Sequence, residues 1–425
     1  MRVKKMSSIP SVKVLQPPLA IDFGAHSLKI LQVSGGESPR IIAATQLDTP
    51  DEIVNDSSAR LRFQLQALPK LVRKGKFSAK RAVCVLPATN MFCKHMRLQL
   101  SEGVDARSMV AATLPAQIGC PYETLICREH EVVGASSGGK TEIICMAVSR
   151  ELVGRFMASM KSAHLQPVGM HSPFHAVVQA FDSVKRRAED AQQPVLYLDL
   201  GYASTDVVLA HGQRIVFART VDLGGLHLDE AIVSQREVSL EEARHLRWKI
   251  PASQVAVCES EAPSESGGLA MLQAAIAREE GEHGISPKHA KDDAAAAVAQ
   301  ERRVGEQAPG MSSQIAAATG GPAFPEGVDL SEQLEILQDE IAMCLRYHKS
   351  MFPNQPVDHA VLMGGEARQV WLCQTLARGL RLSMQVGDPL SRLDRANATC
   401  RGVDLGKAQP GWAAALGACL SPTDL

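Results

Sequence analysis

One short pattern occurs twice in this chain and constrains its fold more than any other feature. Ile21-Asp22-Phe23-Gly24 and Leu198-Asp199-Leu200-Gly201 each end an apolar run with Asp-x-Gly, and a second apolar run follows each after small or hydroxyl-bearing residues. Each copy predicts a β-hairpin, because Asp and Gly are residues that tight turns favour. Two similar hairpins, one near the start and one near the middle, indicate two similar halves that face each other across a cleft.

The residues of the two turns suit the binding of a nucleoside triphosphate. Glycine lets the backbone approach a phosphate closely, and successive turn amides can form an anion-binding nest. Asp22 and Asp199 would repel a phosphate directly, so we expect them to hold a hydrated Mg²⁺. Taken singly, each Asp-x-Gly is more often a plain hairpin turn. The predicted phosphate and metal ligands are Asp22, Gly24, Ser27, Lys29, Asp199, Gly201, Ser204, Thr205 and Asp206.

Two of these residues have a second interpretation. Lys29 either reaches the phosphates as a point charge or is simply solvated. Asp206 either orients a catalytic water or ties down its own turn, and it is a weak candidate for a catalytic residue. The catalytic residue therefore stays unknown at this stage.

Two glycine pairs predict the other end of the nucleotide. Gly364-Gly365 follows the apolar run at residues 359–363 and is expected beside the base, and Gly224-Gly225 is expected beside the sugar. Either pair alone is more often a structural loop. Between these pairs, Ser239-Leu-Glu-Glu242 forms a capping box that predicts a helix as far as Trp248.

Bulk composition narrows the class of protein. The length of 425 residues predicts two or three domains. A hydrophobic content of 45%, a charged content of 21% and a net charge of −1 are typical of a soluble globular protein and argue against a nucleic-acid surface. The ten cysteines include no Cys-x-x-Cys pair and favour a reducing compartment, hence the cytoplasm. No apolar run approaches the ~18 residues of a membrane helix.

Two segments lack the composition of a packed domain. Residues 1–18 read as a flexible arm. Residues 251–330 are rich in Ala, Gly, Glu, Ser and Pro and are predicted to be a mostly disordered, low-complexity insertion, since they offer little apolar surface to bury.

A rival nucleotide-binding motif lies in the first half. Gly134-Ala-Ser-Ser-Gly-Gly139-Lys140-Thr141 satisfies the P-loop pattern. A P-loop needs a helix that begins at the Lys-Thr pair, whereas Glu142-Ile-Ile-Cys-Met-Ala-Val is a β-type run. We therefore favour a hairpin with a Gly/Ser tip at this position.

Three segments in order carry a resemblance. Asp22-Phe-Gly, Asp199-Leu-Gly-x-x-Ser-Thr-Asp and Leu362-Met-Gly-Gly resemble the two phosphate segments and the adenosine segment of the actin, chaperone and sugar-kinase superfamily. Within it the chain most resembles the type IV pilus assembly protein PilM family, relatives of the division protein FtsA, above all over residues 195–250. It departs from that family at Ala25 and His26, which occupy positions where small and hydroxyl residues are usual, so one phosphate donor is missing.

The resemblance implies an α/β fold of the actin-like two-lobed type, built from duplicated RNase H-like domains. The first lobe is expected to comprise residues 19–89 and 161–193, with a small inserted subdomain at 90–160. Residues 194–250 and 331–425 are expected to form the second lobe.

The resemblance also implies an ATP- and Mg²⁺-binding cytoplasmic scaffold of type IV pilus, secretion or competence assembly, peripheral on the inner face of the inner membrane. Its implied partners are other pilus assembly proteins and the tail of a PilN-like inner-membrane protein, bound to the first lobe near the inserted subdomain. Membrane association would come only through such partners, and homo-oligomerisation is left open. With no general base evident, ATP would act mainly as a conformational ligand, with weak or no hydrolysis.

Two other classes of function stay open. One is an active ATPase or kinase of the same superfamily, which would use Asp206. The other is a nucleotide-free platform that serves only as an interaction surface.

Overall fold

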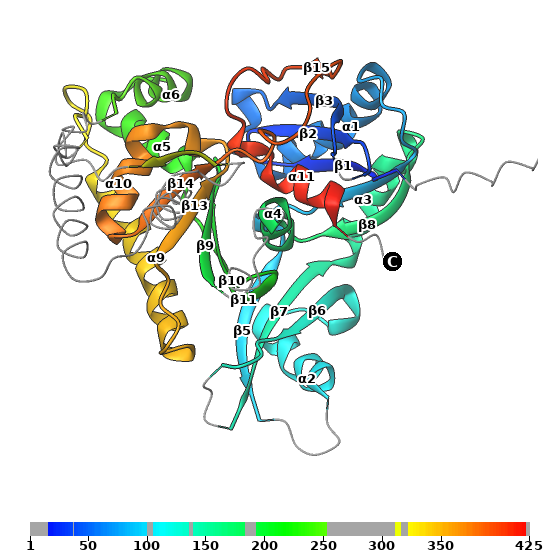
Figure 1. Ribbon diagram of the computed structural model, residues 1–425, viewed down its shortest axis with the longest axis vertical. Coiled ribbons are helices and arrows are strands. Elements are labelled where there is room, and N and C mark those ends of the chain that lie inside the picture. The colour runs from blue at the N-terminus through cyan, green and yellow to red at the C-terminus, as the bar shows by residue number, and fades with distance from the viewer. Residues whose placement is uncertain are drawn as a thin grey trace, which may run out of the picture.

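The computed structural model describes residues 16–36, 38–99, 105–135, 139–182, 193–252, 311–315 and 322–421. Two six-stranded sheets form two lobes, and a three-stranded sheet forms a smaller unit below them (Figure 1). Short 3-10 helices connect several elements: η1 (Asp51–Ile53), η2 (Ala88–Asn90), η3 (Tyr122–Thr124), η5 (Glu366–Arg368) and η6 (Pro410–Trp412).

The first sheet contains the first Asp-x-Gly hairpin. In spatial order its strands are β15 (Thr399–Arg401), β3 (Ile41–Asp48), β2 (Ser27–Val33), β1 (Leu19–Phe23), β4 (Arg81–Val85) and β8 (Gln166–His171). β1 pairs antiparallel with β2 and parallel with β4, so the predicted hairpin over residues 19–33 is confirmed.

Helices cover both faces of this sheet. Leu19 and Ile21 point to the face covered by α1 (Ser57–Lys74) and α3 (Arg150–Ser162), whereas Ala20 points to the face covered by α4 (Pro173–Asp182) and α11 (Ala413–Leu420). Burial on both faces explains why β1 is a continuous apolar run apart from Asp22. Asp22 lies near the C-terminal end of β1.

The second sheet repeats the topology of the first. In spatial order its strands are β11 (Arg214–Val221), β10 (Thr205–His211), β9 (Pro194–Leu200), β13 (His359–Met363), β14 (Ser383–Gly387) and β12 (Met311–Ile315). β9 pairs antiparallel with β10 and parallel with β13, as β1 does with β2 and β4. Five strands in each sheet therefore follow one plan, which confirms the predicted duplication. The helices that the structure describes in this lobe are α5 (Gly225–Arg236), α6 (Leu240–Trp248), α9 (Ser331–Met351) and α10 (Val370–Leu380).

In its described residues, the inserted subdomain is a three-stranded sheet with one α-helix. Its strands are β5 (Phe92–Leu98), β7 (Thr141–Ser149) and β6 (Leu125–Glu131), and α2 (Ala106–Ile118) packs on them. Thr141 begins strand β7 and not a helix, so the P-loop interpretation of Gly134–Thr141 is wrong. Residues 136–138 of that motif lie outside the described residues.

Three elements lie in a different part of the fold from the one predicted. α3 was expected in the inserted subdomain, but Phe156 and Met160 pack with α1 in the core of the first lobe. β15 and α11 were expected in the second lobe, but β15 pairs with β3 and α11 packs against α4 and β1 (Figure 1). α11 is apolar on all sides, and such a helix must be buried on all sides.

The outlying segments are only partly described. The predicted arm at residues 1–18 and the predicted insertion at 251–330 lie mostly outside the described residues. Within the insertion, Met311–Ile315 forms β12 and pairs antiparallel with β14. Among the helices that the structure does describe, none is both long enough and apolar enough to cross a membrane.

The packing of α11 on α4 gives a stability prediction. A Cβ at Gly417 would lie 1.7 Å from the Ala176 carbonyl oxygen, whereas a Cβ at Gly154, exposed on α3, meets nothing within 4 Å. Gly417→Ala should lower the free energy of unfolding by about 1–3 kcal/mol. The matched control Gly154→Ala should raise it by up to about 1 kcal/mol. Denaturant unfolding of both variants tests this, and effects of the same sign would contradict the packing of α11.

Candidate functional site

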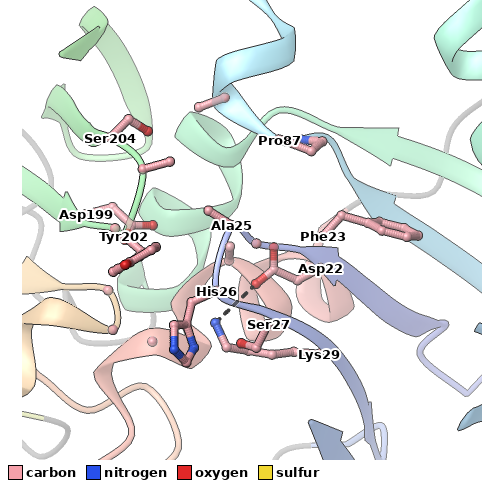
Figure 2. A pocket seen from close by; sticks show the side chains of 18 of the residues that line it. Asp22, Phe23, Ala25, His26, Ser27, Lys29, Pro87, Asp199, Tyr202 and Ser204 are labelled. Carbon is pink, nitrogen blue, oxygen red and sulfur yellow. Dashed lines mark ion pairs between the residues drawn. The ribbon is translucent and has the colours of Figure 1, made fainter. Parts of the chain in front are cut away.

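A cleft of about 290 Å³ lies between the lobes, and both Asp-x-Gly turns open into it. Figure 2 shows Asp22, His26 and Ser27 of the first turn facing Asp199, Tyr202 and Ser204 of the second. The end of β13 and the start of η5 form a further wall. The predicted ligands that line the cleft are Asp22, Gly24, Ser27, Lys29, Asp199, Gly201, Ser204, Asp206, Gly364 and Gly365.

Three predicted ligands do not line the cleft. The Thr205 side chain is buried, and its hydroxyl donates to the Leu223 carbonyl oxygen at 2.8 Å. A Cβ at Gly224 would lie 2.6 Å from the Gly201 carbonyl oxygen, and one at Gly225 would lie 2.6 Å from the Glu366 carboxyl group. These three residues lie outside the cleft and pack against the residues that form its walls.

Gly364 and Gly201 allow close packing at the floor of the cleft, around the Asp199 carboxylate and the second turn. Gly364 has a φ of +93°, and a Cβ there would lie 2.4 Å from Asp199 Oδ1. The Gly201 amide donates to the Ser204 carbonyl oxygen at 3.0 Å and closes the second turn, where a Cβ would lie 2.7 Å from the same oxygen. Any larger residue at either position would displace the carboxylate or open the turn.

Three carboxylic acids gather at this floor. Burial raises the pKa of Asp22, while the Lys29 ammonium, 3.6 Å from its Oδ2, opposes the rise. Burial also raises the pKa of Asp199 to about 6, with Lys29 opposing and the charge of Asp22 adding to it. Burial and the charge of Asp199 raise the pKa of Asp206 to about 8, although the Thr220 hydroxyl donates to it at 2.7 Å.

Lys29 lines the cleft and is not simply solvated. Its ammonium is largely buried and pairs with Asp22, as the dashed line in Figure 2 shows. An added divalent cation would lower the repulsion among the acids, and carboxylate oxygens are the ligands that Mg²⁺ prefers. The donor set thus fits a hydrated Mg²⁺ beside phosphate groups.

Sequence reasoning missed a network of charged residues on α6. The fully buried Arg247 guanidinium donates to Asp229 Oδ1 and to Glu366 Oε2, each at 2.5 Å. One turn earlier, Arg244 donates to the Tyr202 hydroxyl at 2.6 Å and to Asp51 Oδ1 of the first lobe at 2.5 Å. The capping box did predict this helix, and the three-residue spacing of the two arginines would have placed them on one face.

Trp248 ends α6 at the rim of the cleft and was not predicted as a site residue. Its side chain is 40% exposed, and the Arg368 guanidinium of η5 lies over its ring at 5.5 Å from the centroid. Both residues line the cleft next to the Gly364-Gly365 pair. An exposed aromatic face with a guanidinium beside it suits the stacking of a planar base.

Comparisons with known proteins point to one family. A family model described as "Type IV pilus assembly protein PilM" matches residues 20–252. The solved "PilM-PilN type IV pilus biogenesis complex" contains a chain with 16% identity and a TM-score of 0.61, with 95% of this chain and 98% of that chain covered. Together with the duplicated sheets, this likeness shows that the chain has the expected actin-like fold.

Two further structures are more distant. The ethanolamine utilization protein EutJ from Carboxydothermus hydrogenoformans has 12% identity and a TM-score of 0.44, covering 96% of this chain and 90% of its own. MreB5 of Spiroplasma citri bound to ADP has 12% identity and a TM-score of 0.40, covering 89% and 94%.

The raised pKa of Asp206 predicts a pH dependence of stability. The folded chain keeps this proton up to a pH of about 8, whereas the unfolded chain loses it near the ordinary value of 3.8. Stability should therefore fall as the pH rises between these values, by up to about 1.4 kcal/mol per pH unit from this group. Asp206→Asn should remove that slope from denaturant unfolding curves, and Asp339→Asn, exposed on α9, should keep it. An unchanged slope in Asp206→Asn would refute the assignment.

Proposed function

Because the chain belongs to the type IV pilus assembly protein PilM family, we propose that it is an ATP-binding, actin-like scaffold of type IV pilus assembly. In this proposal its nucleotide state controls its binding to the tail of an inner-membrane partner. The observation that carries the nucleotide part is the convergence of two Asp-x-Gly turns on one cleft, with buried carboxylates at its floor.

The two turns would bind the phosphates and the metal. Asp22 and Asp199 would hold Mg²⁺ through its water shell, and the bound cation would offset the phosphate charge. Ser27 and Ser204 would add hydroxyl donors from opposite lobes, beside the turn amides. Thr205, Gly224 and Gly225 would support these ligands from behind.

The other end of the nucleotide would lie on the second lobe. Gly365 has open space where a Cβ would be, so its backbone is accessible to the sugar or the base. Trp248 and Arg368 would stack with the base beside it.

Nucleotide would act as a conformational ligand because it contacts both lobes. It can shift an equilibrium between open and closed clefts only if its affinity differs between the two. Contacts that already cross the cleft set that equilibrium: Arg244 pairs with Asp51, and the His26 ring lies 5.4 Å from the ring of Tyr202.

The surroundings of Asp206 support weak or absent hydrolysis. A general base accepts a proton in its ionised form, and its pKa is best matched to the operating pH. Burial and the neighbouring Asp199 hold the pKa of Asp206 at about 8, so without a cation it is mostly protonated at pH 7. The residue is thus better suited to fix its own strand through Thr220 than to activate water.

The proposed partner is the cytoplasmic tail of a PilN-like membrane protein, bound to the first lobe near the inserted subdomain. A related protein forms a PilM-PilN complex, which supports a partner of this kind. Such a tail would hold this chain on the inner face of the inner membrane, where other pilus assembly proteins would join it. The test is pull-down of the purified chain by a single-span partner with and without Mg-ATP, and equal capture in both would refute nucleotide control.

The metal ligands can be tested by substitution. Asp199→Ala should weaken Mg-ATP binding at least about tenfold, since one metal-holding carboxylate is lost. The control Lys140→Ala changes the lysine of the P-loop-like motif and should bind as the wild type does. Isothermal titration calorimetry measures both affinities. Loss of binding in Lys140→Ala alone would contradict the proposed site.

The base site gives a fluorescence prediction. Of the three tryptophans, Trp248 and Trp412 line the cleft, but Trp412 is almost fully buried, as is Trp371, whereas Trp248 is 40% exposed. Mg-ATP should therefore change the emission of the wild type, and Trp248→Phe should remove most of that change. A change of equal size in Trp248→Phe would place the base elsewhere.

A further inference from the structure

His26 occupies the tip of the first phosphate turn, where the family resemblance leads one to expect small and hydroxyl residues at Ala25 and His26. The Thr49 amide donates to its carbonyl oxygen at 2.8 Å and fixes the turn. Its side chain is 39% exposed and lines the cleft. The ring meets Tyr202, at the tip of the opposite turn, edge to face at an interplanar angle of 74°. The imidazole therefore stands between the two turns that would hold the phosphates.

Charged groups of both signs face this imidazole. From its own lobe, Asp48 at the end of β3 has its Oδ1 4.0 Å from His26 Nδ1, and Lys29 lies on β2. From the second lobe, Arg244 of α6 and Glu366 of η5 act on it.

Their net effect favours the neutral ring. Burial and then Arg244 lower the pKa of His26, and Asp48 and Glu366 oppose them without reversing the shift. In the cleft without nucleotide, His26 is therefore uncharged at neutral pH.

We infer that His26 contacts the nucleotide phosphates as an imidazolium, so that binding of a nucleoside triphosphate takes up one proton at this residue. The inference rests on the proposed function. A phosphate group brings negative charge to the imidazole, and an opposite charge within about 4–6 Å favours the charged form of a titratable group by about 1–3 pKa units.

The proton comes from solvent, and no covalent bond forms or breaks. The charged ring offers two N–H donors, whereas a hydroxyl offers one. His26 would therefore replace the missing donor and add a positive charge. Phosphate binding by the first turn would then depend on the protonation of His26, rather than simply being weaker than phosphate binding by the second turn.

Linkage fixes the sign of the pH dependence. Between the pKa of His26 in the free cleft and its higher pKa beside phosphate, the complex holds more protons than the free protein. Nucleotide affinity should therefore rise as the pH falls through this window, by up to about tenfold per pH unit. Above and below the window His26 contributes no slope. By reciprocity, nucleotide must make His26 harder to deprotonate.

Calorimetry can count this proton. Binding of Mg²⁺ with a non-hydrolysable ATP analogue is measured near pH 7 in buffers of different ionisation enthalpy. Two variants accompany the wild type: His26→Ser, which restores a hydroxyl, and His26→Asn, which keeps a neutral donor. Wild type should take up as much as about one proton more than either variant. Asp199, Asp206 and the nucleotide titrate in all three proteins, so their contribution cancels in the difference.

A second measurement needs no functional variant. The ¹⁵N signal of His26, identified by its absence from the His26→Asn spectrum, should titrate at a higher pH when the analogue is bound. An unchanged midpoint, or equal proton uptake in all three proteins that still bind the analogue, overturns the role of His26 and leaves the proposed function intact. Failure of the wild type to bind the analogue overturns both.

Discussion

Three carboxylic acids held together at the floor of one cleft are the constraint on which the rest of the site depends. Asp22, Asp199 and Asp206 all have raised pKa values because burial disfavours their ionised forms, and Lys29 offsets only part of that cost. Two sheets buried on both faces hold the acids in place despite the repulsion. A divalent cation would offset the repulsion that Lys29 does not, so the cleft would suit a metal-bound polyanion.

Helix α6 links the parts of this cleft. Within two turns it contacts the first lobe through Arg244 and Asp51, and the wall beside the proposed base site through Arg247 and Glu366. Trp248 then ends the helix at the rim. A shift of α6 would therefore change the base site and the contact between the lobes together. This is the physical link that a nucleotide-controlled scaffold needs, because a ligand acts on whichever lobe arrangement it binds better.

A feature of this structure could be predicted from the sequence when residues close together in the chain determine it. The two hairpins and the capped helix before Trp248 follow from local patterns, and all were predicted. The places of β15 and α11 were not, because which sheet a late segment joins depends on contacts across most of the chain. Thr205 and Gly224 belong to the predicted motif, but only the fold shows that they face away from the cleft.

The central claim is that the two Asp-x-Gly turns together form a metal–nucleotide site. Anomalous scattering from Mn²⁺, substituted for Mg²⁺ in crystals grown with an ATP analogue, locates the metal directly. The account predicts a single strong peak at the cleft floor between the carboxylates of Asp22 and Asp199, reached through water. A peak elsewhere, for instance at the loop that carries Lys140, or a cleft without metal and nucleotide under these conditions, would contradict it.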